Sequence, residues 1–351
     1  MLMEGRPLQG RELEQLKQFL SRMELTYDDG IEYSVCILDE NYDIIGTGSV
    51  DHNVIKCVAI DPEHQGQGLS ASVISSLVQY EFEQGRTQFF IYTKPKNLRM
   101  FADMGFYTIL QTPDILFMEN RASGFAKFLS GLKAETPPEA LNLEAGAPDS
   151  EPCIGAVVAN CNPFTKGHRY LIEQALKQCD YLHLFVLSDN RSFFSAEERY
   201  QMVQEGVRDL PHVILHRTSD YMISAATFPT YFFKDQMQGE KANCRLDLEL
   251  FAQRIAGELH ITKRFVGTEP FCSVTRGYNE EMKQVLPAYG ITVTEIERTC
   301  LDEVPVSASE VRRCLEAQDH ERIQELVPNA VYEYLCRSGR LSSGMREQEL
   351  K

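Results

Sequence analysis

The chain has 351 residues, of which 43% are hydrophobic, and it carries 35 basic against 51 acidic side chains, for a formal net charge of −16. This length and apolar content predict two domains, each with its own core. The excess of acid argues against nucleic acid or an anionic membrane as the main partner. No apolar run approaches a membrane span, and the amino terminus is unlike a signal peptide, so we expect a cytoplasmic protein. Ten cysteines without a C-x-x-C pair predict neither a zinc site nor a disulfide framework.

The first 133 residues predict a mixed α+β domain. Apolar residues at helical spacing indicate a first helix from Arg11 to Leu20, and short β-branched runs indicate strands that follow it. Taken in chain order, the elements expected next are strands at Tyr33–Leu38, Ile44–Val50 and Val54–Ile60, a helix through Val73 to Phe82 and a strand at Gln88–Thr93.

A glycine-containing loop from Asp61 to Ser70 joins the third of these strands to the second helix. Backbone N–H groups at such a junction can hold a pyrophosphate. The loop resembles the Q/R-x-x-G-x-G/A segment of the GNAT acetyltransferase fold, which binds coenzyme A, with Ser70 where Gly or Ala is usual. The resemblance implies that the following residues contact a coenzyme A moiety: Gln65, Gly66, Gln67, Gly68, Ser70 and Asn97.

Two roles for this domain stay open. Nothing in the sequence identifies a general base for an acceptor amine, so we favour binding of a coenzyme-A-like group over acetyl transfer; a fold whose coenzyme site has decayed is the alternative. Lys94, Lys96 and Arg99 add local positive charge. In an acidic chain, this neighbourhood is where an acidic partner would dock.

Residues 134–151 are rich in proline and acid and lack an apolar period, so we expect an exposed linker there. The second domain, predicted over 152–338, opens with an apolar strand from Ile154 to Val158. A short Asn/Pro/Gly turn and an amphipathic helix through Leu171 to Leu176 follow it. Where a buried strand leads into a helix, the helix amino terminus favours a bound anion.

That turn contains the motif T-x-G-H, formed by Thr165, Lys166, Gly167 and His168. The first and last residues of the motif are three apart, so we expect their side chains to face one bound phosphate, where His168 can stabilise charge on a leaving pyrophosphate. A solvated histidine after a glycine turn is the alternative for an isolated motif.

The motif resembles the H/T-x-G-H signature of the nucleotidyltransferase superfamily, and two later segments match the same superfamily in order: Val266 to Glu269, and Ser307 to Arg312. Ser307 is also the start of an S-x-x-E capping box. The resemblance implies a catalytic role for Thr165, Lys166, His168 and Arg312, and ATP binding with Mg²⁺. The expected ATP contacts are Asn160, Asn162, Pro163, Phe164, Gly167, Arg191, Gly267, Thr268, Glu269, Ser307 and Ser309.

The rest of the second domain alternates strands and helices, which predicts a Rossmann-like parallel sheet. Arg191 lies in a loop after the second strand, and a solvated loop arginine is its alternative role. Residues 219–232 mix hydroxyls with aromatics and can line a small-substrate pocket. The remaining strands are expected at Tyr181–Leu187, His212–His216, Arg264–Val266 and Ile291–Ile296, the helices at Leu248–Leu259, Asn279–Leu286 and Val331–Arg337, and a polar tail at 339–351.

The pairing of the two domains, together with the segment from Ser219 to Phe232, resembles the citrate (pro-3S)-lyase ligase family. Members of that family use ATP and acetate to acetylate the thiol of the coenzyme-A-derived prosthetic group on the acyl-carrier (gamma) subunit of citrate lyase, through acetyl-AMP, with release of AMP and pyrophosphate. The resemblance implies this activity here. Three alternatives stay open: a nucleotidyltransferase that makes a coenzyme, a GNAT acetyltransferase with an accessory nucleotide-binding domain, and a nucleotide sensor without activity.

Overall fold

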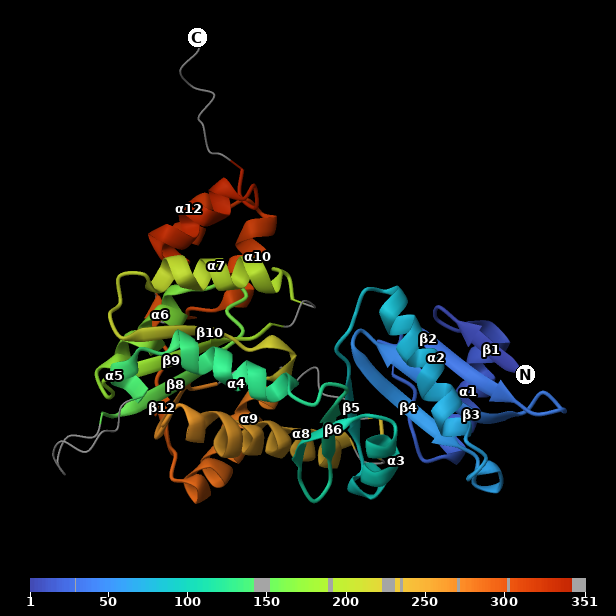
Figure 1. The fold of residues 1–351 in the computed structure, drawn as a ribbon. Coiled ribbons are helices and arrows are strands. Elements are labelled where there is room, and N and C mark those ends of the chain that lie inside the picture. Colours follow the sequence, from blue (N-terminus) through green and yellow to red (C-terminus); the bar gives the residue numbers. More distant parts are fainter. Residues whose placement is uncertain are drawn as a thin grey trace, which may run out of the picture. The chain divides into compact units, whose positions relative to one another are not determined.

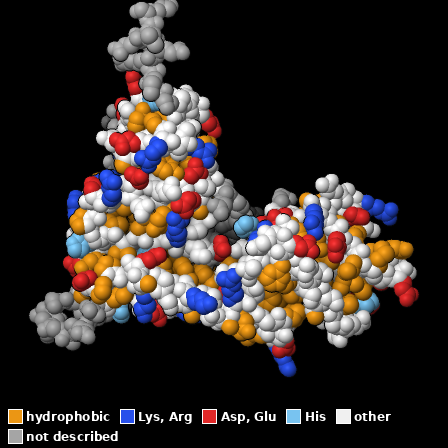
Figure 2. All heavy atoms as spheres, turned by 45° about the horizontal axis from the view of Figure 1, so that its top comes forward, with side chains coloured by type: hydrophobic (Ala, Val, Ile, Leu, Met, Phe, Trp, Pro, Cys, Tyr) orange, Lys and Arg blue, Asp and Glu red, His pale blue; other side chains and the backbone are white. Residues whose placement is uncertain are grey.

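The computed structural model describes residues 1–28, 30–141, 152–188, 192–222, 231–233, 236–269, 272–301 and 304–342. The chain forms two compact units (Figure 1). The first comprises the described residues of 1–127 and 228–246, and the second those of 128–227 and 247–351. Within these ranges, no helix combines the length and the apolar character that crossing a bilayer requires. On the face drawn in Figure 2, basic side chains are interspersed with acidic ones.

The first unit is built on a seven-stranded sheet in the order β1-β2-β3-β4-β5-β7-β6. Neighbouring strands are antiparallel except for β4 and β5, which are parallel and pair only at Val54 with Phe90 and Ile55 with Ile91. The strands are β1 Leu2–Gly5, β2 Tyr33–Leu38, β3 Ile44–Asp51, β4 Val54–Ile60, β5 Phe90–Thr93, β6 Tyr107–Gln111 and β7 Leu116–Glu119.

Helix α2 (Leu69–Glu83) packs on this sheet through Val73, Ile74 and Leu77, which recur at helical spacing and belong to one core cluster with strand residues. The other helices of this unit are α1 (Gly10–Arg22) and α3 (Leu98–Asp103), with single 3₁₀ turns at Pro62–His64 and Pro95–Asn97. The α+β class predicted for the amino-terminal part is confirmed.

The second unit contains a five-stranded parallel sheet in the order β10-β9-β8-β11-β12, which confirms the predicted parallel-sheet class. Figure 1 shows α6 and α7 along one side of this sheet and α9 along the other. The strands are β8 Ile154–Ala159, β9 Tyr181–Val186, β10 Val213–Arg217, β11 Lys263–Gly267 and β12 Thr292–Ile296, with a small hairpin of β13 Cys300–Leu301 and β14 Val304–Pro305.

The helices around this sheet give the second unit its layers. Alternate strand residues such as Leu182 and Leu184 pack with Ile172 of α6 and Met202 of α7 in one core. The helices that lie wholly in this unit are α5 Pro138–Leu141, α6 Lys166–Leu176, α7 Ala196–Val207, α9 Ser273–Val285, α10 Ala308–Glu316, α11 His320–Leu326 and α12 Asn329–Arg337, and 3₁₀ turns lie at Ser219–Tyr221 and Leu286–Tyr289. Two helices run from the first unit into the second: α4 Gly124–Glu135, and α8 Gln236–Leu250, which continues as a π-helical turn at Phe251–Ala256.

The structure differs from the expected domain boundaries at two places. Helix α4 crosses residue 133 and α5 follows it, with Ala140 fully buried, where the sequence predicts an exposed linker from residue 134. An apolar stripe of Phe125, Leu129 and Leu132 buries one side of α4. Residues 231–233 and the start of α8 cluster with the first unit, although they lie inside the predicted range 152–338. Residues 142–151 of the linker and 343–351 of the tail lie outside the described residues.

Candidate functional site

The second unit has a cavity at the carboxyl ends of two neighbouring strands. Strand β8 is central, with β9 on one side and β11 on the other, so the chain connections leave it in opposite directions. In open α/β sheets, such a point creates the crevice in which ligands bind. The cavity measures about 600 Å³, and residues at the ends of β8 and β11, the start of α6 and the start of α10 line it.

Thr165 and His168 close the amino terminus of α6 by a reciprocal cap. Thr165 is the N-cap: its Oγ1 accepts the backbone N–H of His168 (3.3 Å), and its own backbone N–H donates to His168 Nδ1 (3.1 Å). Thr165 is 1% exposed, and its hydroxyl lies 2.9 Å from the same Nδ1. Both residues line the cavity, and Thr165 uses its hydroxyl to orient His168. Their contact with a phosphate stays a prediction.

This cap fixes which ring nitrogen of His168 is available. Nδ1 accepts a backbone N–H, so the proton of the neutral ring is on Nε2, which has no hydrogen-bond partner among the residues described. Burial, and then the nearby Arg298 guanidinium, lower the pKa of His168 to about 4. At neutral pH, the side chain therefore offers the cavity an uncharged N–H donor.

Most of the predicted nucleotide contacts come together in this cavity. Those that line it are Asn160, Thr165, Gly167, His168, Gly267, Glu269, Ser307 and Ser309. Gly167 permits a close approach of two segments, because a Cβ there would lie 3.1 Å from the Val306 carbonyl. Ser307 is the N-cap of α10, and its Oγ accepts the Glu310 N–H (3.2 Å), as the capping-box alternative expects. Arg191 lies outside the described residues.

Two predicted site residues point elsewhere. Phe164 is fully buried in the core, where its ring lies so close to Gly206 that a Cβ there would approach it to 2.5 Å. Its side chain therefore holds the loop in place and does not face a ligand. Lys166 is exposed, and its Nζ donates to the Gln324 carbonyl (2.9 Å). Neither side chain lines the cavity.

Arg312 connects α10 to the loop after β8. Its Nη1 donates to the Asn162 carbonyl (2.6 Å) and its Nη2 to Ser309 Oγ (3.0 Å). Asn162, which precedes a cis bond to the buried Pro163, accepts the Phe194 N–H on its Oδ1 (3.0 Å). Arg312, Asn162 and Pro163 therefore lie around the loop after β8 and do not line the cavity itself, whereas Ser309 does. The proposed contact of Arg312 with phosphate remains a prediction.

Two arginines that the sequence interpretation did not single out support the cavity walls. Arg199 on α7 is fully buried and donates to the carbonyls of Asn160 (2.8 Å), Leu187 (2.6 Å) and Phe194 (3.2 Å), and to Asn160 Oδ1 (2.7 Å). Arg298 lines the cavity, pairs with Glu269 and donates through Nε to the carbonyl of Thr268 (2.6 Å). Neither belongs to a recognisable motif, so no local signal identifies them.

A buried polar cluster lies at the opposite wall. Arg264 of β11 and Tyr278 of α9 line the cavity, and the Tyr278 hydroxyl donates to Asp247 Oδ2 of α8. The sequence signal for it is the arginine that directly precedes the apolar residues of the strand K-R-F-V-G.

The first unit has a separate cavity of about 910 Å³ beside the glycine loop. Of the predicted coenzyme contacts, Gln65, Gly66, Gly68, Ser70 and Asn97 line it, whereas Gln67 does not. Gly66 and Gly68 have φ angles of +80° and +76°, a backbone conformation that favours glycine, so the loop turns sharply into α2. Asn97 holds its own end of the cavity by donating to Thr93 Oγ1 (2.8 Å).

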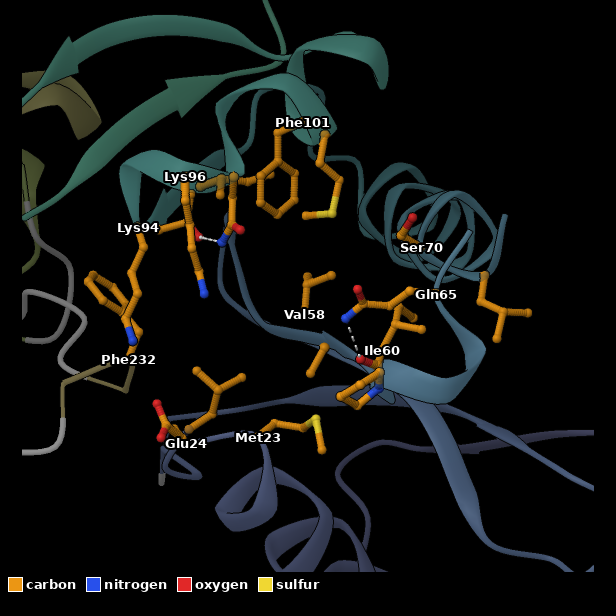
Figure 3. Close-up of a pocket in the computed structure, with 18 of the residues that line it drawn as sticks. Met23, Glu24, Val58, Ile60, Gln65, Ser70, Lys94, Lys96, Phe101 and Phe232 are labelled. Carbon is orange, nitrogen blue, oxygen red and sulfur yellow. Dashed lines mark hydrogen bonds between the residues drawn. The ribbon is translucent and has the colours of Figure 1, made fainter. Parts of the chain in front are cut away.

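Figure 3 shows how charged and apolar side chains share this hollow. Lys94 and Lys96 extend into it from the segment after β5, and Gln65 faces them from the glycine loop. Val58 and Ile60 of β4 form an apolar floor, and Phe101 of α3 adds apolar surface from another wall. An anionic group near the lysines and an extended apolar arm along the floor suit this arrangement.

Tyr231 closes one wall of that cavity. Its hydroxyl donates to the Tyr92 carbonyl of β5 (2.7 Å) and receives a backbone hydrogen bond from Cys57 of β4, while its carbonyl accepts the Thr26 N–H (2.8 Å). The ring therefore fills the gap where β4 and β5 have separated. Residues 219–232 are predicted to line a small-substrate pocket; Tyr231 and Phe232 do line a cavity, but it is this one, and residues 223–230 lie outside the described part of the chain.

Comparisons with known proteins agree with both units. The model of the citrate lyase ligase C-terminal domain matches residues 154–335, and that of the acetyltransferase (GNAT) family matches residues 9–106. Among solved structures, Thermotoga maritima TmcAL bound with alpha-thio ATP is 14% identical, covers 54% of this chain and 57% of its own, and has a TM-score of 0.38, which is too low to carry an argument.

Relatives of known name match almost the whole chain. The citrate (pro-3S)-lyase ligase of Klebsiella pneumoniae is 39% identical over 327 residues, or 92% of each protein. That of Haemophilus influenzae is 40% identical over 336 residues, which cover 94% of this chain and 97% of the relative. That of Escherichia coli K12 is 38% identical over 333 residues, which cover 93% and 91%. With two units that match in order and relatives that match from end to end, this chain belongs to the citrate (pro-3S)-lyase ligase family of enzymes.

Proposed function

We propose that this enzyme uses ATP to activate acetate as acetyl-AMP and then acetylates the thiol of the coenzyme-A-derived group on the acyl-carrier subunit of citrate lyase, which activates the lyase. The observation that carries the first step is the capped His168 at the mouth of the 600 Å³ cavity. Its neutral Nε2–H and the amino terminus of α6 are the donors that a triphosphate requires. The family of the chain supports the choice of substrates.

In the first step, an acetate oxygen attacks the α-phosphorus of ATP. A new O–P bond forms, the bond to the bridging oxygen breaks, and pyrophosphate leaves with the electron pair. His168 donates a hydrogen bond from Nε2 to a phosphate oxygen as negative charge builds up on the leaving group. The protein otherwise contributes positioning, because acetate itself is the nucleophile and no covalent enzyme intermediate is needed.

Mg²⁺ accompanies ATP in this proposal. The described residues contain no group of three His, Cys, Asp or Glu side chains that could hold a metal ion alone. Mg²⁺ commonly binds through one or two carboxylates together with substrate phosphates, and Glu269 and Glu297 line the cavity as carboxylates of that kind. The ion would neutralise charge on the triphosphate.

In the second step, the carrier thiol attacks the acetyl carbonyl of acetyl-AMP. A C–S bond forms, the C–O bond to AMP breaks, and the thiol proton is released to water. We assign the cavity of the first unit to the coenzyme-A-like arm, with its phosphates toward Lys94, Lys96 and the glycine loop. The position of Tyr231 argues against an independent amine acetyltransferase. An acceptor amine would reach the coenzyme-A-like arm through the gap between β4 and β5, and the Tyr231 ring fills that gap.

The test of the proposed function is exchange of labelled pyrophosphate into ATP. We expect exchange that requires acetate and does not require the carrier protein, because acetyl-AMP formation is the reversible first step. Exchange that proceeds without acetate would favour a nucleotidyltransferase with another acceptor. Turnover of acetyl-coenzyme A with an amine, without ATP, would favour the acetyltransferase alternative.

Replacement of Lys96 by alanine is expected to weaken binding of coenzyme A to the full chain by about tenfold, because the ammonium group would lose a phosphate contact. Titration calorimetry measures the affinity. The matched control is Arg99→Ala, since the Arg99 side chain is 95% exposed and does not line the cavity. If both variants lost the same affinity for coenzyme A, the effect would come from general surface charge. That result would contradict the assignment of this cavity to the coenzyme-A-like arm.

A further inference from the structure

The opposite wall of the nucleotide cavity holds a buried arginine, Arg264. Arg264 is 3% exposed, and its Nε has no hydrogen-bond partner. No described residue forms an ion pair or a hydrogen bond with its guanidinium group. The ring of Phe251 lies 4.5 Å from the guanidinium carbon, and Asp247 and Tyr278 interact with the group electrostatically. A buried charge of this kind is costly unless a ligand or another group neutralises it.

The direction of the side chain follows from the strand. Phe265 belongs to the core that also contains Ile172 of α6, and successive strand residues point to opposite faces. Arg264 therefore lies on the face covered by α8 and α9, across the sheet from α6, and it still lines the same cavity as His168.

The neighbours of Arg264 favour a small anion over a phosphate chain. Asp247, which is 7% exposed, accepts the Tyr278 hydroxyl and places a carboxylate near the guanidinium group, so the site has little net positive charge to offer. Met282 of α9 lines the same cavity with apolar surface. A planar guanidinium matches a carboxylate in two parallel hydrogen bonds, and the apolar surface suits a short alkyl group.

We propose that Arg264 binds the carboxylate of the acid that is activated, so that this end of the cavity is the subsite for a short-chain monocarboxylate. The inference rests on the proposed function, because it divides one cavity between ATP at the α6 side and the acid at the α8 and α9 side. Arg264 forms two hydrogen bonds to the carboxylate and leaves a lone pair on one oxygen to attack the α-phosphorus. Tyr278, held by Asp247, borders the same subsite.

The test measures the concentrations of acetate and of ATP that give half-maximal pyrophosphate exchange. It compares the full wild-type chain with the variants Arg264→Met and Arg264→Lys. In Arg264→Met we expect the acetate concentration for half-maximal exchange to rise by about 10- to 100-fold, as loss of a charge-assisted pair predicts. The ATP concentration for half-maximal exchange should change by less than about threefold. Broadening of the NMR signal of carbon-13-labelled acetate by the protein measures acetate binding independently of activity. This broadening should be lost in Arg264→Met.

Each other outcome has a defined meaning. If Arg264→Met does not fold, Arg264→Lys decides, because it keeps the charge and loses the planar pair, and its acetate requirement should still rise. An unchanged acetate requirement, or an equal loss of ATP affinity, overturns the subsite while the ligase activity stands. A wild-type chain without acetate-dependent exchange overturns the proposed function and this inference together.

Discussion

Replacing His168 with asparagine is expected to lower acetate-dependent pyrophosphate exchange by about 100- to 1,000-fold, the usual loss when one donor to a developing charge is removed. Asparagine can still accept the Thr165 N–H on Oδ1, as Nδ1 does in the structure, so the cap on α6 is kept. Only the Nε2–H donor is lost. The variant should therefore unfold at nearly the same temperature as the wild type.

The matched control is His168→Gln, whose amide nitrogen can reach the place of Nε2 while the cap to Thr165 is lost. We expect this variant to retain more exchange than His168→Asn. Retention of wild-type exchange in His168→Asn would show that the Nε2 donor takes no part in the reaction. A higher rate in His168→Asn than in His168→Gln would show that His168 acts by capping the helix.

The pH dependence gives an additional test of the same residue. Because the pKa of His168 is lowered to about 4, the ring is neutral over the physiological range, and the ratio of wild-type to His168→Gln exchange rates should stay constant between roughly pH 6 and 8. A ratio that falls as the pH rises past 6.5 would identify the imidazolium as the active form. The lowered pKa also means that the unfolded chain binds a proton more readily, so the stability contributed by neutral His168 is present above pH 6.5 and is lost as the pH falls toward 4.

Substituting Arg199 with methionine is expected to destabilise the second unit by about 3–5 kcal/mol. The buried guanidinium donates to the carbonyls of Asn160, Leu187 and Phe194. Methionine would remove these hydrogen bonds and leave the carbonyl of the buried Phe194 without this donor. Exchange should fall with stability, since Asn160 lines the cavity at the ends of β8 and β11. Denaturant unfolding followed by circular dichroism measures the change, and the two units can unfold in separate transitions.

Arg208→Met is the matched control for this second substitution, because Arg208 follows the last turn of the same helix and is exposed. It should change stability by less than about 0.5 kcal/mol. Equal unfolding midpoints for the two variants would mean that the acceptors around Arg199 find water or other donors when the arginine is removed.

Local patterns in the sequence predict the central part of this molecule well. The strand, turn and helix around Thr165 and His168 lie within one short stretch, so apolar periodicity and turn residues are sufficient to place them. The cap between these two residues is likewise local, three positions apart, although the sequence interpretation assigned both side chains to phosphate. The glycine loop at Gly66 and Gly68 was predictable for the same reason, since only a few residues determine its backbone.

Contacts between distant residues could not be predicted in this way. Arg199 reaches Asn160 across 39 positions, and Tyr231 reaches Tyr92 across 139, with no periodic pattern that links either pair. Phe164 is part of the predicted motif, but only its packing against Gly206 shows that its ring belongs to the core. Helix α4 was missed although Phe125, Leu129 and Leu132 have helical spacing, because proline and acid farther along suggested a linker.

The place of Tyr231 in the first unit affects how the protein can mature on the ribosome. Amino-terminal domains often fold while the rest of the chain is still being translated. Here the gap between β4 and β5 is filled by Tyr231, which is translated long after both strands. In a nascent chain that ends upstream of residue 231, this gap in the first unit is still open. A gene fragment cut at the end of the amino-terminal sheet would produce that same unfinished intermediate, with the backbone groups of Tyr92 and Cys57 exposed to solvent.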